Sequence, residues 1–165
     1  MSGYLSALWL DFAGAAVASS SALIGLLFVA VSINLEEILA SSTLAERTLH
    51  TMILFTVAFV VGMLFLLPDQ PRTVLGVELI MTGAAAGAAL LWINRPGKRG
   101  EREPQWGWLL VRLVPSVTIT IFLIIGGLSL IAGVGGGLYW VAPAVIEAFL
   151  AGLVTVWILL IEIRR

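Results

Sequence analysis

The sequence predicts an all-α, polytopic transmembrane helical bundle of about five spans, forming a single integral membrane domain over residues 1–165. Of its residues, 60% are hydrophobic and only 12% are charged, which is more apolar surface than a water-soluble domain of this length can bury. The apolar residues also fall into long runs, without the apolar–polar alternation of a membrane barrel. We therefore expect helices, because lipid offers no hydrogen-bond partner to backbone groups and a helix satisfies them internally.

Five apolar runs of spanning length are expected at residues 12–35, 49–67, 74–93, 109–132 and 138–161. Each has about 20 residues or more, enough to cross a hydrocarbon core about 30 Å thick as a helix. The boundary between the last two runs is open at this stage. The uncharged, glycine-rich linker at residues 133–137 is compatible with a tight turn between two full spans and with a break inside a re-entrant pair.

The basic residues predict the orientation. With five spans, Arg72 falls on one side and the other basic residues fall on the opposite side. These are Arg47, Arg95, Lys98, Arg99, Arg102, Arg112, Arg164 and Arg165. Because cytoplasmic loops of membrane proteins are enriched in Lys and Arg, the N-terminus is expected outside and the C-terminus in the cytoplasm.

Small residues recur at helical spacing in three of the runs and predict close helix contacts. They are Gly14, Ala18, Ser21, Gly25 and Ser32 in the first run, Gly83 and Gly87 in the third, and Ala144, Ala148, Ala151, Gly152 and Thr155 in the fifth. Packing within the chain is one interpretation of these faces, and contact between copies in a homo-oligomer is the other.

Glu147 is the residue that most directly points to a function. It lies nine residues past Leu138, which is about 13 Å into the helix and close to the bilayer midplane. An acid at that depth costs about 3 kcal/mol on insertion scales, and no Lys or Arg of the five runs lies at the same depth.

Three arrangements would offset this cost. The carboxyl group is protonated and neutral, or it hydrogen-bonds to a hydroxyl of Ser19, Ser20, Ser21, Thr118 or Thr120, or it lines a wet cavity and meets a mobile proton or cation. Under the third interpretation, the expected pathway comprises Glu147, Glu78, Thr155 and Thr82. For Glu78, which lies near the outer end of its run, the alternative explanation is a side chain that extends to the headgroups.

Two further segments are polar at the expected cytoplasmic side. Ser32, Asn34 and Glu36 would form either an acidic pore mouth or a helical extension lying on the membrane surface. The basic loop is expected to bind anionic lipid headgroups through Arg95, Lys98, Arg99, Arg102, Trp106 and Trp108. The single histidine, His50, is expected at the inner start of the second span with a structural role.

Several functional classes have no support in the sequence. There is no cysteine and only one histidine, so neither a metal site nor a bound cofactor is expected. The net charge of -1 gives no reason to expect nucleic-acid binding. Metalloprotease and serine-hydrolase motifs are missing from the sequence, and we therefore expect no enzymatic activity.

The segment GLLFVAVSINLEEIL at residues 25–39 resembles a stretch of small bacterial multi-span membrane proteins, some of which are labelled modulators of the membrane protease FtsH. The similarity covers the first span and the Gly-Val-Glu sequence at residues 76–78. This resemblance implies a multi-pass protein of the bacterial plasma membrane and assigns no functional residue.

Two functions are compatible with these features. The first is a homo-oligomeric membrane channel or proton/cation pathway that uses the intramembrane carboxyl groups. The alternative is a non-catalytic accessory or scaffold subunit that binds another membrane protein or lipid, with the small-residue faces as docking surfaces.

Overall fold

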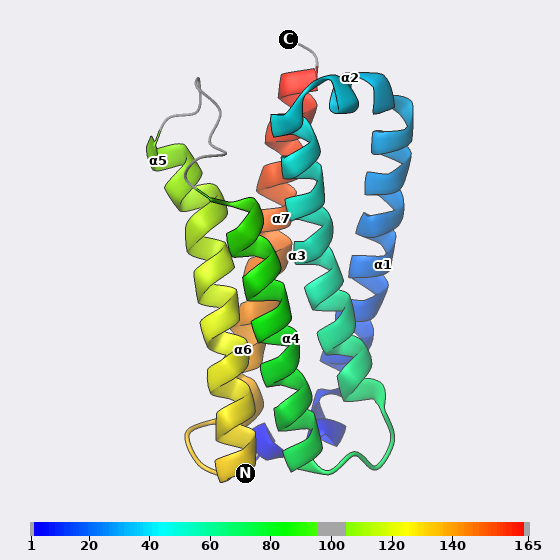
Figure 1. Ribbon diagram of the computed structural model, residues 1–165. Coiled ribbons are helices and arrows are strands. Elements are labelled where there is room, and N and C mark those ends of the chain that lie inside the picture. Colours follow the sequence, from blue (N-terminus) through cyan, green and yellow to red (C-terminus); the bar gives the residue numbers. More distant parts are fainter. Residues whose placement is uncertain (1, 96–104, 164–165) are drawn as a thin grey trace.

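The computed structural model of the protein describes residues 2–95 and 105–163, and within these ranges its regular elements are helices (Figure 1). The long helices are α1 (Leu10–Ile33), α3 (Ser42–Leu66), α4 (Arg72–Ile93), α6 (Val114–Ala132) and α7 (Val141–Ile163). The shorter ones are α2 (Leu35–Ala40), α5 (Gln105–Trp108), the π-helical segment η4 (Leu109–Leu113), and the 3₁₀ turns η1 (Ser2–Tyr4), η2 (Ser6–Trp9) and η5 (Gly137–Trp140).

Five helices are long and apolar enough to cross a membrane, so the predicted multi-pass helical bundle is confirmed. Residues 133–137 form a turn between α6 and α7, both of which run the full length of the bundle (Figure 1). The two termini lie at opposite ends, as five crossings require (Figure 1). The second span begins at Ser42 rather than at the expected residue 49, because its first two turns continue the helix with polar residues.

Four of the spans form the core of the molecule. Helix α3 packs against α4 and α7, and α6 packs against the same two helices, so that α3, α4, α6 and α7 enclose an apolar interior. Helix α1 lies outside this group and packs mainly along α3 (Figure 1). The buried interior is filled by side chains such as Leu54, Val61, Leu79, Leu123 and Val145.

The closest helix contact is between α4 and α6, where two glycines face each other. A methyl group added at Gly127 would lie 2.4 Å from the carbonyl oxygen of Gly76, and one added at Gly76 would lie 2.7 Å from the carbonyl oxygen of Gly127. Only glycine permits this approach of two backbones. The predicted pair in the same helix, Gly83 and Gly87, also packs against α6 within the chain.

The small residues of α7 are buried as expected: Ala144, Ala148, Ala151, Gly152 and Thr155. Gly152 contacts the ring of Phe55 in α3. The small residues of the first run are not buried. Helix α1 packs on α3 through Ala13, Ala16 and Ser20, so all five residues of its predicted small-residue stripe are exposed. Packing within the chain is therefore the wrong interpretation for that stripe.

The chain leaves the first span through a short surface helix. Helix α1 ends at Ile33, and Asn34 folds its side-chain amide back onto the carbonyl oxygen of Ala30 at 2.8 Å. In the following helix α2, Glu36 and Glu37 are exposed while Ile38 is buried. This amphipathic pattern is typical of a helical extension along the end of the bundle, which was one of the two expected alternatives; the other was an acidic pore mouth.

Candidate functional site

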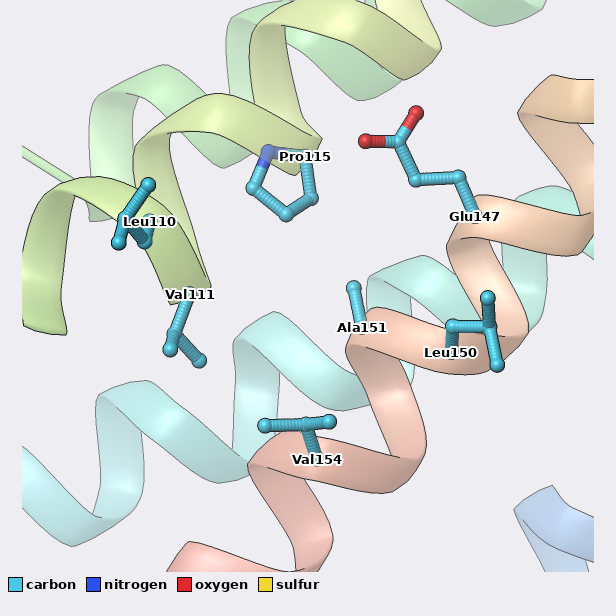
Figure 2. A pocket seen from close by; sticks show the side chains of 7 residues that line it. All are labelled: Leu110, Val111, Pro115, Glu147, Leu150, Ala151 and Val154. Carbon is cyan, nitrogen blue, oxygen red and sulfur yellow. The ribbon is translucent and has the colours of Figure 1, made fainter.

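Glu147 lies at one end of an apolar groove between α7 and the continuous segment formed by η4 and the start of α6 (Figure 2). Leu110, Val111 and Pro115 form one wall, and Leu150, Ala151 and Val154 of α7 form the other. The groove has a volume of about 270 Å³. Figure 2 shows the carboxyl group extending from α7 toward α6, beside Pro115. Of the described residues that line the groove, Glu147 is therefore the one that is ionisable, and the others are apolar.

The carboxyl group has a hydroxyl partner, one of the five that the sequence offered. Thr118 Oγ1 lies 2.6 Å from Glu147 Oε1 and 2.8 Å from the carbonyl oxygen of Val114. A hydroxyl has a single proton, so it cannot donate to both oxygens at once. Thr118 therefore donates either to Glu147 or to Val114 at any one time, and it is the hydroxyl that the chain places against the carboxyl group.

The groove faces outward, away from the packed interior. Leu110, Leu150 and Val154 on its walls are 60%, 61% and 47% exposed, whereas Ala144 and Ala148 on the other side of α7 are fully buried. Glu147 itself is half-buried. In a membrane, such a face meets lipid or another transmembrane helix. Among the residues that the structure describes, those that line the groove include no basic side chain to pair with Glu147.

A second polar site, which the sequence analysis did not assemble, lies inside the bundle near the α2 end. Asn94 follows α4 and is only 2% exposed. Its side-chain nitrogen lies 3.1 Å from His50 Nδ1 in α3 and 2.9 Å from Ser116 Oγ in α6. Its side-chain oxygen accepts a hydrogen bond from Arg112 Nε at 2.9 Å. These four residues, the Asn94 cluster, link three helices.

The donor-only guanidinium fixes the proton positions in this cluster. Because Arg112 Nε donates to Asn94 Oδ1, the amide nitrogen of Asn94 must be the donor toward His50 Nδ1. His50 is then neutral and carries its proton on Nε2. That nitrogen is buried and has no hydrogen-bond partner in the described parts of the chain.

A local distortion of the helix carries Arg112 inward. Pro115 has no amide hydrogen, and its ring would collide with the carbonyl group four residues earlier in a regular α-helix. The chain forms the π-helical segment Leu109–Leu113 at this point, which widens the turn ahead of the proline. The side chain of Arg112 is consequently only 2% exposed. From its position in the sequence, Arg112 was expected only to add to the positive charge at the inner surface.

The other predicted pathway residues lie apart from the groove. Glu78 of α4 is half-buried and accepts a hydrogen bond from Gln70 in the turn before that helix, so its carboxyl group points toward the end of the span. Thr82 is half-buried on the same helix. Thr155 is buried and donates to the carbonyl oxygen of Ala151 at 2.8 Å. Glu78 and Glu147 therefore each have a separate partner within one chain.

The residues predicted for the cytoplasmic mouth lie in α1, in α2 and at the junction between these two helices, which pack on α3. Ser32 is exposed and donates to the carbonyl oxygen of Phe28, Asn34 is half-buried, and Glu36 is exposed. Of the predicted lipid-binding residues, Arg95 and Trp106 are exposed and Trp108 is half-buried. Lys98, Arg99 and Arg102 lie outside the described residues.

Comparison of the chain with protein-family models, with curated proteins and with solved structures finds no match. The interpretation of both sites therefore depends on their geometry.

Proposed function

We propose that the protein is a homo-oligomeric membrane channel or proton/cation pathway of the bacterial plasma membrane, with Glu147 as the residue that carries the proton or meets the cation. The observation that carries this proposal is the position of the Glu147 carboxyl group, which lies in an outward-facing apolar groove with the hydroxyl of Thr118 as its partner. Ionisable groups held inside a membrane at such a cost are functional by default.

The packing of the bundle supports a pathway between copies of the chain. At the depth of Glu147 the space enclosed by α3, α4, α6 and α7 is filled with apolar side chains, so a single copy has little room for a polar route there. The carboxyl group instead opens onto the outer face of α6 and α7. A second copy packed beside this face would supply the other side of a route that includes Glu147 and would leave the groove open to the bilayer.

Proton flux in liposomes tests the proposal. Purified protein is reconstituted, a pH gradient is imposed with a potassium-clamped membrane potential, and the internal pH is followed with a trapped dye. We expect flux above that of empty liposomes for the wild type, and at least a tenfold reduction for Glu147→Gln, which keeps the size of the side chain but cannot release a proton. Glu37→Gln, on the exposed helix α2, is the matched control.

Two results would contradict the proposal. Wild-type liposomes that are no more permeable than empty ones would exclude the whole class, and equal flux in the wild type and Glu147→Gln would remove Glu147 from the mechanism. The mass of the purified protein in mild detergent adds an independent check, because a single copy per particle would contradict a pathway between copies.

Helix α1 favours a second candidate, an accessory subunit that docks another membrane protein. Within its most apolar window only 17% of the residues are buried, against 50% for α3. In the described parts of the chain, no neighbouring atom lies within 4 Å of a methyl group added at Gly14 or Gly25, so a partner helix could approach α1 closely. Affinity capture in mild detergent separates the candidates, because a stoichiometric heterologous partner would favour this function.

A further inference from the structure

The groove at Glu147 has the chemistry of a site for an organic cation. We propose that it binds lipophilic cations, such as quaternary ammonium or phosphonium compounds and hydrophobic amines, in exchange for the proton of Glu147. The inference rests on the proposed function, since it names the cation that would compete with the proton at the same carboxyl group.

The charge of the site points to a cation from outside the chain. If Glu147 loses its proton, the hydroxyl of Thr118 is its hydrogen-bond donor, and the remaining walls are hydrocarbon. An isolated carboxylate in such surroundings is strongly destabilised. A positively charged ligand held against Glu147 would remove that cost, because none of the described residues that line the groove is basic.

The walls discriminate between kinds of cation. A sodium, potassium or magnesium ion that leaves water needs several oxygen ligands, and among the described side chains at the groove only Glu147 and the adjacent Thr118 carry oxygen. A quaternary ammonium or phosphonium ion carries its own hydrocarbon shell and is weakly hydrated. Its apolar groups match Val111, Pro115 and Val154, so the same walls that reject a metal ion favour an organic one.

The shape of the groove gives the ligand a place and an entry route. The hydrocarbon walls continue from Glu147 to Val154, seven residues or about 10 Å along α7. Ala151, one turn from Glu147, presents only a methyl group to the space between the helices (Figure 2). Because the wall residues Leu110 and Leu150 are largely exposed on the membrane-facing surface, a lipophilic cation would enter from the bilayer.

Binding has a defined proton balance. The protonated carboxyl group of Glu147 releases its proton as the cation takes its place, which leaves a carboxylate paired with the bound cation. One proton therefore leaves for each quaternary cation that binds, and low pH opposes binding. No oxidant, reductant or covalent intermediate is involved.

Equilibrium binding of tritiated tetraphenylphosphonium to the purified full-length protein in detergent tests the proposal. We expect saturable binding that weakens as the pH falls, with one proton released per bound cation in a lightly buffered solution containing a pH dye. Glu147→Gln should weaken binding at least tenfold, and Glu37→Gln should leave it unchanged. Triphenylphosphine oxide, a neutral compound of similar shape, should not compete.

Two variants test the position of the ligand while the carboxyl group stays in place. Ala151→Leu fills the middle of the groove, and Val154→Trp fills its far end from an exposed position that tolerates a larger side chain. Each should weaken tetraphenylphosphonium binding several-fold while leaving helical content and the elution volume unchanged. If Ala151→Leu fails to fold, Val154→Trp alone decides.

The proposal is overturned if binding is not saturable, if Glu147→Gln binds as tightly as the wild type, or if the neutral compound competes equally well. These outcomes are separable from failure of the proposed function. A protein that binds the cation with proton release but gives no proton flux in liposomes would contradict the pathway and keep this inference. Proton flux that depends on Glu147, in a protein that does not bind the cation, would contradict this inference and keep the proposed pathway.

Discussion

At the scale of single residues, the contact between Glu147 and Thr118 determines what the groove can do. One hydroxyl proton serves two acceptor oxygens, so a proton on the carboxyl group would turn both contacts into hydrogen bonds. Under the proposed function, this is the proton that the site exchanges. The lipid-facing position of the groove allows that proton to be exchanged without unfolding the bundle.

Thr118→Val tests this arrangement. Valine keeps the shape of threonine but cannot accept the hydrogen bond, so the carbonyl stretch of the Glu147 carboxyl group should move to higher frequency in the infrared spectrum. The free energy of unfolding should fall by about 1 kcal/mol. Thr120→Val is the control, since the hydroxyl of Thr120 donates to the backbone carbonyl oxygen of Ser116 at 2.7 Å. A carboxyl band that stays in place would contradict the assignment.

Asn94 carries a second prediction at this scale. Its amide bonds to His50, Ser116 and Arg112, so Asn94→Leu would leave three buried polar groups with one hydrogen bond fewer. We expect a loss of about 3 kcal/mol in the free energy of unfolding, measured in mixed micelles. Asn34→Leu removes a single local bond and should cost less than about 1 kcal/mol. Equal losses would mean that the cluster does not hold the three helices together.

The sequence was sufficient to single out Glu147, because an acid inside an apolar run is visible by counting. It was also sufficient to offer Thr118 among the possible partners. The Asn94 cluster could not be found in the same way. Its members come from three helices, and Arg112 reaches the interior only because the π-helical segment turns it inward. The one available signal was Pro115 three residues later, which indicates a distortion but not its direction.

At the scale of elements, the tightest constraint on the bundle is the contact of α4 with α6. The facing glycines Gly76 and Gly127 bring two backbones together, and neither carbonyl group can move without moving its helix. This contact supports the groove indirectly, because α6 provides Thr118 and one wall. Helix α1 has no comparable contact at its outer face, where Gly14 and Gly25 are open.

Gly127→Ala should therefore destabilise the protein by about 1–3 kcal/mol, as expected for an overpacked contact. Gly25→Ala, which makes the same change in a membrane-spanning helix with open space around it, should leave the free energy of unfolding of the monomer unchanged within about 0.5 kcal/mol. Thermal unfolding in detergent measures both. A harmless Gly127→Ala would show that α4 and α6 are not in backbone contact.

Hydrophobic run length predicted all five spans, because a membrane imposes a minimum length on an apolar helix. Run length could not show which face of each helix is buried. The small residues of α7 are buried and those of α1 are exposed, although both sets have the same spacing. The difference arises from the order of packing around α3, which depends on contacts between segments far apart in the sequence.

At the scale of the whole molecule, the charge distribution predicts the direction of insertion. Arg47, Arg95 and Arg112 lie toward the end of the bundle that bears α2, while Arg72 starts α4 at the other end (Figure 1). From the positive-inside rule we expect α2 in the cytoplasm and the turn between α6 and α7 outside. The groove of Glu147 would extend from mid-depth toward the cytoplasmic side.

Single-cysteine labelling tests this orientation without background, since the chain contains no cysteine. Val134→Cys lies in the exposed turn between α6 and α7, and Glu37→Cys lies on the exposed side of α2. In intact cells, a membrane-impermeant maleimide should label the first and spare the second, and permeabilised cells should show labelling of both. The opposite pattern would invert the proposed orientation.

The most direct test of the central claim, that Glu147 is a protonated acid open to the lipid, is its reaction with dicyclohexylcarbodiimide, which partitions into membranes and adds to protonated carboxyl groups. Intact-mass and peptide analysis of the protein in lipid should show one adduct per chain at Glu147, with Glu37 unmodified. Glu147→Gln should show none. If Glu147 in the folded wild-type protein stays unmodified while a carboxyl group elsewhere reacts, the account of this site is wrong.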